Sequence, residues 1–195
     1  ADRPDGKQLF FDVEGSRLNA WETAEYYCRQ IAAAGYTLEP DYTLNFAIFN
    51  ESSQENIFVI PMDKTLYTNQ FIYLFRSRHY NHAKAYGLSG ENGSSATPEA
   101  LETFGYDTPD TDPRFDFCYF AGPVKDLDGN PVLLDDGQTP LVYEPWQVGI
   151  DLSGSAYEQT AGARMKKYEV DKNALKDGKL INNDIVLFRY ADVLL

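Results

Sequence analysis

The C-terminal stretch from Asn183 to Leu195 constrains the fold more than any other part of this sequence. An apolar run, Ile185–Phe188, leads into Arg-Tyr-Ala-Asp and then into Val-Leu-Leu. Arg189 and Asp192, three residues apart, can pair across one helical turn. Four residues follow the i, i+4, i+7, i+8 spacing of one helix face: Val186, Tyr190, Val193 and Leu194. The pattern predicts a helix that is unfinished at Leu195, so we expect the chain to be part of a longer protein.

A second helix is predicted over residues 20–34. Asn19 is a good N-cap, and Glu22 completes a capping box with it. Gly35 stands where such a helix ends. One face of this helix combines small and apolar residues, which allows a neighbouring helix to approach closely: Ala20, Ala24, Tyr27, Ile31 and Ala34.

Shorter elements are predicted along the rest of the chain. Residues 1–15 are polar and turn-rich, and we expect a loop there or the tail of an earlier helix. Asn56–Ile60 alternates too little for a half-exposed strand and is expected to be a short buried one. A helix is predicted over 98–104, with Pro98 in its first turn and Ser95 or Thr97 as its cap.

Turn-forming residues dominate the stretch from 105 to 160, which we expect to be a loop-rich excursion with small hairpins. The strand-like runs within it lie at 115–120, 132–134 and 141–143. After the excursion, one more helical turn is predicted within residues 172–179.

The composition excludes several classes of function. At 195 residues and 43% hydrophobic content the chain is globular, yet its net charge of −13 disfavours nucleic acid and anionic lipid, which both require a basic partner. No window reaches the ~20 apolar residues of a membrane-spanning helix. Cys28 and Cys118 are expected to be free thiols, with a disulfide as the alternative. Aromatic residues make up 14% of the chain, an excess that suits stacking surfaces as well as cores.

The segment from Tyr67 to Tyr86 mixes aromatic rings with planar polar side chains. Its aromatic members include Tyr67, Phe71, Tyr73, Phe75, Tyr80 and Tyr86, and its polar members include Asn69, Arg76, Arg78, His79, Asn81 and His82. Sugar rings stack their C–H faces on aromatic rings, and their hydroxyls bond to planar polar groups, so this mixture suits a carbohydrate platform. The alternative is that Phe71, Tyr73 and Phe75 alternate along a buried strand while the polar residues face water.

No cofactor is expected. Asp126-Leu-Asp-Gly-Asn130 begins like a calcium loop, but Pro131 and Gly137 replace the glycine and glutamate that such a loop requires, so a hairpin turn is predicted. Calcium bound by oxygens from distant segments stays open as an alternative. His79 and His82 are spaced i, i+3, but tetrahedral zinc would need further ligands.

Several motifs, in this order, resemble the SusD/RagB family of outer-membrane glycan-binding lipoproteins. The matching stretches are "WETAEYYCRQIAAAGY" (21–36), "ENIFVIPM" (55–62), "ATPEALETF" (96–104), "DPRF" (112–115), "RMKKYEVD" (164–171) and "LFRYADVLL" (187–195). Thr97-Pro98 inverts the family's Pro-Thr, and Phe104-Gly-Tyr-Asp replaces its usual Asp-Gly. The family's lipid-bearing N-terminus and C-terminal helices are absent from this sequence.

The resemblance implies a mainly α-helical fold of tetratricopeptide-type helix pairs, with a loop-rich insertion and a few short strands. Residues 1–195 would form part of a single domain. Within it, 20–62 would be a helix-pair segment, 63–160 a loop-rich ligand-binding portion, and 161–195 a truncated return to the helical portion. Trp21 holds the family's structural tryptophan position and is expected in the core.

The implied function is non-catalytic binding of oligosaccharide or polysaccharide, as in starch utilisation, and delivery to a SusC-like TonB-dependent transporter. The chain would act at the cell surface, on the outer membrane, through a lipid anchor not present in this sequence. Because residues 67–86 occupy the place of the family's ligand-stacking aromatics, the candidate binding residues are Tyr80 and Tyr86, then Tyr73, Arg78 and His79, with Trp146 as a separate candidate.

Two other functions compete with this one. A glycoside hydrolase would use a pair of carboxylates hidden among the 30 acidic residues, although no catalytic motif is present and we expect no enzymatic activity. A protein-binding scaffold or adhesin subunit would bury its aromatic residues. Exposure of the 67–86 segment favours ligand binding, and its burial favours the scaffold.

Overall fold

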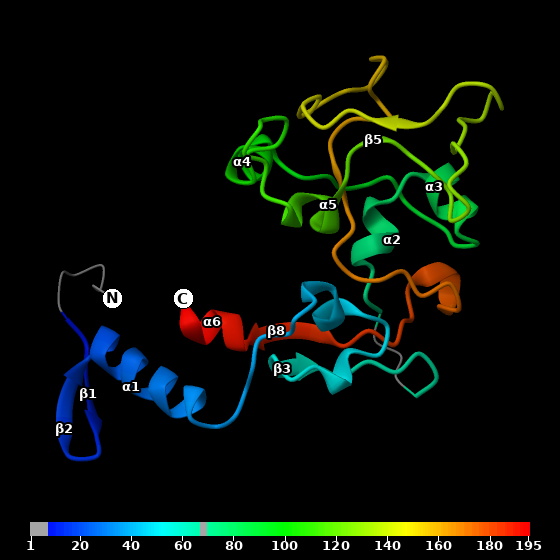
Figure 1. Cartoon of the computed structure of the whole chain (residues 1–195). Coiled ribbons are helices and arrows are strands. Elements are labelled where there is room, and N and C mark those ends of the chain that lie inside the picture. The colour runs from blue at the N-terminus through cyan, green and yellow to red at the C-terminus, as the bar shows by residue number, and fades with distance from the viewer. Residues whose placement is uncertain (1–7, 67–69) are drawn as a thin grey trace. The chain divides into compact units, whose positions relative to one another are not determined.

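The computed structural model describes residues 8–66 and 70–195, except for the side chain of Tyr73 (Figure 1). The chain divides into two units. Unit 1 consists of Ala1–Asn45, Glu51–Ile60 and Val186–Leu195, and unit 2 consists of Phe46–Asn50 and Pro61–Ile185.

The described residues form short helices and short paired strands. The α-helices are α1 (Ala20–Ala32), α2 (Tyr73–Ser77), α3 (Tyr80–Ala85), α4 (Pro98–Thr103), α5 (Arg114–Cys118) and α6 (Tyr190–Leu194), and the 3-10 helices are η1 (Tyr42–Phe46), η2 (Asn50–Ser52) and η3 (Lys176–Gly178). The strands are β1 (Phe10–Val13), β2 (Ser16–Asn19), β3 (Asn56–Ile60), β4 (Tyr119–Phe120), β5 (Gly122–Pro123), β6 (Val142–Tyr143), β7 (Arg164–Met165) and β8 (Ile185–Arg189).

The prediction of a mainly α-helical fold built from helix pairs is wrong. Helix α1 has 13 residues, but the other five helices described have only five or six each. The described strands form four two-stranded sheets: β1–β2, β3–β8, β4–β7 and β5–β6. The many Gly, Pro and Asx turns end each element after a few residues, so the chain is mixed α and β.

Unit 1 begins with a β-hairpin where a loop or helix tail was expected. β1 and β2 pair antiparallel, with Val13 opposite Ser16. The two residues between them, Glu14 and Gly15, both have positive φ, 48° and 81°. Two such residues make the type I′ turn whose twist matches that of the flanking strands.

Helix α1 confirms the predicted cap. The Asn19 side chain accepts from the backbone N–H groups of Trp21 and Glu22, and the Glu22 carboxylate accepts from the Asn19 N–H at 2.8 Å. Gly35 follows the helix with a φ of +93°. The expectation of a buried Trp21 is wrong, because this side chain is 73% exposed and α1 has no fully buried residue.

The C-terminal segment is a strand followed by a helix, which corrects the prediction of one continuous helix. β8 pairs with β3, and the backbone N–H of Tyr190 donates to the carbonyl of Glu55 at 2.8 Å. Neighbouring β-branched residues, Ile185 and Val186, favour this extended backbone. β3 has the predicted bounds but is not buried, since Phe58 within it is 55% exposed.

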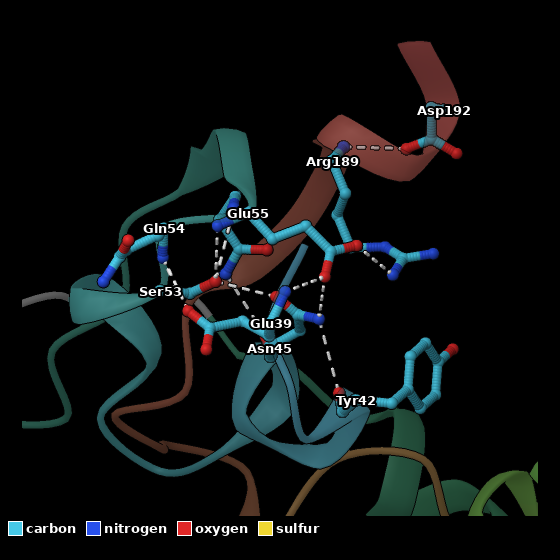
Figure 2. A network of polar contacts seen from close by, with 9 residues as sticks. Glu39, Tyr42, Asn45, Ser53, Gln54, Glu55, Arg189 and Asp192 are labelled. Carbon is cyan, nitrogen blue, oxygen red and sulfur yellow. Dashed lines mark hydrogen bonds and ion pairs between the residues drawn. The ribbon is translucent and has the colours of Figure 1, made fainter. Parts of the chain in front are cut away.

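A polar network surrounds the carboxylate of Glu55 in unit 1 (Figure 2). Its Oε1 pairs with Arg189 Nη1 at 2.8 Å. Its Oε2 accepts from Asn45 Nδ2 at 2.8 Å and from the Glu39 N–H at 3.0 Å. The predicted side-chain pair of Arg189 with Asp192 is therefore wrong: Asp192 instead accepts from the Arg189 backbone N–H at 2.7 Å.

Unit 2 contains the loop-rich part of the chain. Helix α4 and its Thr97 cap confirm the prediction for this segment. The strand-like run at 115–120 is mostly helix α5, and only its end forms β4, which pairs antiparallel with β7. β5 pairs antiparallel with β6. The predicted turn at Asp126 is confirmed, because Oδ1 of this residue accepts from the N–H groups of Asp128 and Asn130.

Two small hydrophobic clusters form the core of unit 2. One contains Ala96, Leu101, Phe115 and Ala163, and the other contains Val124, Val132, Leu141 and Tyr143. The second cluster reaches the polar residues that follow α2 through Tyr143, whose hydroxyl accepts from the His79 N–H.

Two further observations concern the chain in general. Cys28 and Cys118 are free thiols, as the sequence favoured. No helix within residues 8–66 and 70–195 combines the length and apolar character needed to cross a membrane.

Candidate functional site

The predicted binding segment folds as two short helices joined by an extended dipeptide. Arg78 and His79 have extended backbones between α2 and α3. His79 caps α3, because its Nδ1 accepts from the Asn81 N–H at 3.1 Å. This bond leaves the proton of the neutral ring on Nε2, which lies 3.2 Å from Gln159 Oε1. The alternative of a strand through Phe71, Tyr73 and Phe75 is therefore wrong. Tyr67 and Asn69 lie outside the described residues.

A buried tyrosine supports this segment through hydrogen bonds. The hydroxyl of Tyr143, in β6, accepts from the His79 backbone N–H at 3.0 Å and lies 2.9 Å from His82 Nδ1. The donor in the bond between the Tyr143 hydroxyl and His82 is set by the tautomer of the His82 ring. Burial raises the pKa of Tyr143 to about 12, and burial together with the nearby charge of Arg78 lowers the pKa of His82 to about 3. Both groups are thus neutral at pH 7.

Arg78 is a buried cation near Tyr143 and His82. The residue is only 2% exposed, its Nε donates to the Leu74 carbonyl at 3.2 Å, and its Nη1 has no partner among the described residues. Burial lowers the pKa of Arg78 to about 10, so the guanidinium stays charged at neutral pH. Gly90 allows the chain to pass close by, since a Cβ there would lie 2.4 Å from the Arg78 carbonyl oxygen.

The tyrosines of the segment are exposed to different degrees. Tyr80 is 54% exposed, and its ring contacts the edge of the His79 ring at a centroid distance of 5.5 Å. Tyr86 is half-buried, with its ring 4.9 Å from that of His82, and burial raises its pKa. The side chain of Tyr73 lies outside the described residues. Arg78 and His79 are buried, so in this structure they support the surface rather than form it.

A groove of about 500 Å³ lies beside α3 and is called the α3 groove here. It is lined by Asn81, Lys84, Ala85, Asp126 and residues 131–135. Asn81 fixes its width, because its Nδ2 donates to the Leu133 carbonyl at 2.8 Å and to Asp135 Oδ1 at 3.0 Å. Tyr80 is not among the lining residues, but it is four residues before Lys84 and therefore lies on the same face of α3 as this lining residue.

Trp146 belongs to a different part of unit 2. It lies in the loop after β6 and is 44% exposed. Its ring lies 6.0 Å from that of Tyr106, tilted by 47°, and Tyr106 in turn contacts the buried Phe115 at 4.4 Å. The two rings form a second aromatic surface that is anchored on the core.

Sequence reasoning missed the residues that hold the site together. Tyr143 is 64 residues from His79, and the groove wall at 131–135 is about as far from α3 in sequence. The strand-like run at 141–143 predicted a strand but could not show which residues Tyr143 contacts. Asn81 was one of several polar residues in its segment, and only the fold shows that it bridges to Asp135.

The described residues contain no group of three or more His, Cys, Asp or Glu side chains arranged to hold a metal ion. His82, one of the i, i+3 pair, is fully buried and contacts Tyr143 through Nδ1. Asp126 uses its carboxylate to close its own turn. The oxygen-rich segment at Asp126 thus forms a turn in this structure.

The fold is similar to part of a solved structure, that of surface glycan-binding protein A from Bacteroides thetaiotaomicron. The two share 18% sequence identity with a TM-score of 0.57, and the match covers 89% of this chain and 37% of that chain. At this identity the match shows a shared fold, and the chain corresponds to little more than a third of that protein's length. No protein-family model matches the sequence, and no curated protein sequence matches it either.

Proposed function

We propose that this chain binds glycans without making or breaking a bond, and that the α3 groove is the binding surface. The observation that carries the proposal is the exposed ring of Tyr80 on a helix whose first turn is fixed by His79 and Tyr143. A fixed aromatic ring can stack on a sugar without losing much conformational freedom on binding.

The groove supplies the polar partners that a stacked sugar requires. Lys84 offers a donor, and Asp135 and Asp126 offer acceptors for hydroxyl groups. Tyr86, the C-cap of α3, is a further aromatic candidate for sugar contact at the other end of the helix. Arg78 and His79 act as positioning residues beneath it. Trp146 with Tyr106 is a second surface on which a longer glycan could stack.

The biological setting is part of the same proposal. The similar fold belongs to a protein described as a surface glycan-binding protein, which supports glycan binding here. The sequence motifs add SusD/RagB membership, a lipid-anchored position on the outer membrane, and delivery of oligosaccharide to a SusC-like TonB-dependent transporter. Residues 63–160 would be the ligand-binding portion of one domain in the longer protein.

The test is isothermal titration calorimetry of the complete chain against a panel of neutral polysaccharides and their oligosaccharides. Tyr80→Ala is compared with Tyr27→Ala, because both tyrosines are 54% exposed and Tyr27 lies on α1 in unit 1. Loss of one stacked ring is expected to weaken binding about fivefold, which corresponds to ~1 kcal/mol. The Tyr27→Ala variant should bind with the same affinity as the chain without substitutions.

The same samples separate the proposal from its rivals. Release of reducing sugar would identify a glycoside hydrolase. Binding that Tyr80→Ala leaves unchanged and Trp146→Ala abolishes would move the site to the second aromatic surface. A complete lack of binding across the panel would contradict glycan binding and favour a protein-binding scaffold.

A further inference from the structure

A second cavity of about 270 Å³ lies in unit 2, apart from the residues of the α3 groove. Its wall is formed by Asn92, Gly93, Ser94, Ser95, Val148, Gly149, Leu152, Glu158, Ala161 and Arg164. We call it the Arg164 pocket. The segment 92–95 forms one side, and the loop that follows Trp146 forms another. No residue of this pocket lines the α3 groove.

The buried cation of this pocket lacks a counter-charge. Arg164 is 4% exposed, and among the described residues no carboxylate pairs with it. Its Nη1 and Nη2 donate to the backbone carbonyls of Ser94 and Gln159, both at 3.3 Å, and its Nε has no partner in the part of the chain described. The ring of Tyr143 covers one face of the guanidinium at 5.2 Å. Burying such a cation is costly unless an anion or further acceptors reach it.

Asn92 contributes an unused acceptor to the same wall. Its Nδ2 donates to the Gln159 carbonyl at 2.9 Å, while its buried Oδ1 has no partner among the described residues. Its backbone has a φ of +52°, a left-handed conformation that costs energy for a residue other than glycine. Two residues that line the pocket thus carry a buried donor and a buried acceptor without partners among the described residues, and one of them has a strained backbone; such features occur at ligand-binding sites more often than elsewhere.

We propose that the Arg164 pocket binds the carboxylate of an acidic sugar, with Arg164 facing the carboxylate and Asn92 Oδ1 accepting from a neighbouring hydroxyl. The carboxylate follows from the pocket itself, whereas its belonging to a sugar rests on the proposed function. The volume of about 270 Å³ is sufficient for one pyranose ring. Ser94 and Ser95 add hydroxyl groups that can bond to the remaining ring hydroxyls.

A singly charged group fits this pocket better than a phosphate or sulfate. Arg164 supplies the one guanidinium among the described residues that line the pocket, Glu158 lines the same pocket, and the chain has a net charge of −13. A more highly charged anion would add repulsion without a second cation to offset it. The charge of the whole chain is screened beyond about 8 Å at physiological salt, so the local Arg164 dominates for a single carboxylate.

The test is calorimetry or NMR titration of the complete chain with sodium D-galacturonate, sodium D-glucuronate and neutral D-galactose as probes. At least one of the two acids is expected to bind about tenfold more tightly than galactose, because a charge-assisted bond to arginine is gained. Equal affinity for the acids and for galactose would overturn the proposal. Cyclohexanecarboxylate tests the two parts of the proposal separately. If it binds as tightly as the acids, the part that names a sugar is overturned and the part that names a carboxylate stands.

Three variants locate the effect. Val148→Trp fills the pocket from an exposed position, at which Val148 is 39% exposed, and should abolish binding of the acid while the fold is kept. Glu158→Gln removes the exposed negative charge at the pocket and should tighten binding about two- to threefold. Arg164→Lys should weaken it about tenfold, since lysine cannot reproduce the planar fork. A Glu158→Gln variant that binds the acid more weakly would contradict the charge argument.

The proposal can fail separately from the glycan proposal for the α3 groove. Neutral glycan binding that depends on Tyr80, without any preference for acids, would overturn the Arg164 pocket alone. Acid binding that is lost in Val148→Trp and kept in Tyr80→Ala would support the pocket regardless of the groove. For Arg164→Lys, circular dichroism and thermal unfolding show that the variant is folded before its affinity is interpreted.

Discussion

Arg189 Nη1 lies 2.8 Å from Glu55 Oε1, so an ion pair joins residues that are 134 positions apart. The two side chains are 17% and 3% exposed. The pair connects the start of β3 with the end of β8, where Tyr190 also donates its N–H to the Glu55 carbonyl. Two sequence motifs that are far apart in the chain thus form one structural unit (Figure 2).

Replacing Arg189 with methionine is expected to lower the free energy of unfolding by about 3 kcal/mol, because a buried carboxylate loses its cation. Among the described residues, the Glu55 carboxylate would keep Asn45 and the Glu39 N–H as partners. Urea denaturation followed by circular dichroism measures the change. Arg29→Met is the control, since its pair with Glu25 is exposed and should contribute less than about 1 kcal/mol. Similar losses in the two variants would contradict the role assigned to Glu55.

Replacing Tyr143 with phenylalanine is expected to loosen the start of α3. The His79 N–H and His82 Nδ1 would both lose a partner inside the protein, at a cost of about 1–3 kcal/mol. Because Tyr80 lies directly after His79, glycan affinity should fall as well. Denaturation and calorimetry together measure the two effects. Tyr157→Phe is the control, because Tyr157 is partly exposed and no bond of its hydroxyl is described. Unchanged stability in Tyr143→Phe would contradict this support.

Two glycines near Arg78 should respond differently to alanine. At Gly90 a Cβ would lie 2.4 Å from the Arg78 carbonyl oxygen, so Gly90→Ala forces the backbone apart and should cost about 1–3 kcal/mol. At Gly93 the nearest atoms would be 3.5 Å away, which is an ordinary contact. Gly93→Ala should therefore change the melting temperature little or raise it slightly. Equal effects in the two variants would show that the chain does not pass Arg78 as closely as described.

Local sequence chemistry predicted the elements that depend on neighbouring residues. The cap of α1 by Asn19, the cap of α4 by Thr97 and the turn at Asp126 each involve groups within four positions of one another. Such bonds form wherever the segment is placed. The propensity of the local sequence was therefore sufficient for them.

Features that depend on distant partners could not be predicted in this way. The spacing of Val186 and Tyr190 fits a helix face. Pairing with β3 nevertheless makes the segment that contains Val186 a strand, β8. For the candidate site, the sequence named Tyr80 and His79 but not Tyr143, which holds them from 64 positions away. The exposure of Trp21 could not be predicted for the same reason, since an apolar residue on a helix is buried only where another element covers it.

The buried His82 makes the stability of the protein depend on pH. Its pKa in the folded protein is lowered from 6.5 to about 3, first by burial and then by the charges of Arg78 and His79. Between these two values the unfolded chain binds a proton at His82 that the folded protein does not. The free energy of unfolding therefore falls as the pH is lowered below 6.5, by about 1.4 kcal/mol per pH unit from this group.

Urea denaturation at pH 7, 5.5 and 4.5 tests this contribution against a His82→Gln variant, whose side-chain oxygen can still accept from the Tyr143 hydroxyl. The variant is expected to be less stable at pH 7, because glutamine fills the space of the ring imperfectly. Its stability should nevertheless decline less steeply than that of the unchanged chain as the pH falls. Since carboxylates titrate in both proteins, the difference between the two slopes isolates His82. Parallel slopes would mean that His82 is protonated in the folded protein and that its Nδ1 donates to the Tyr143 hydroxyl.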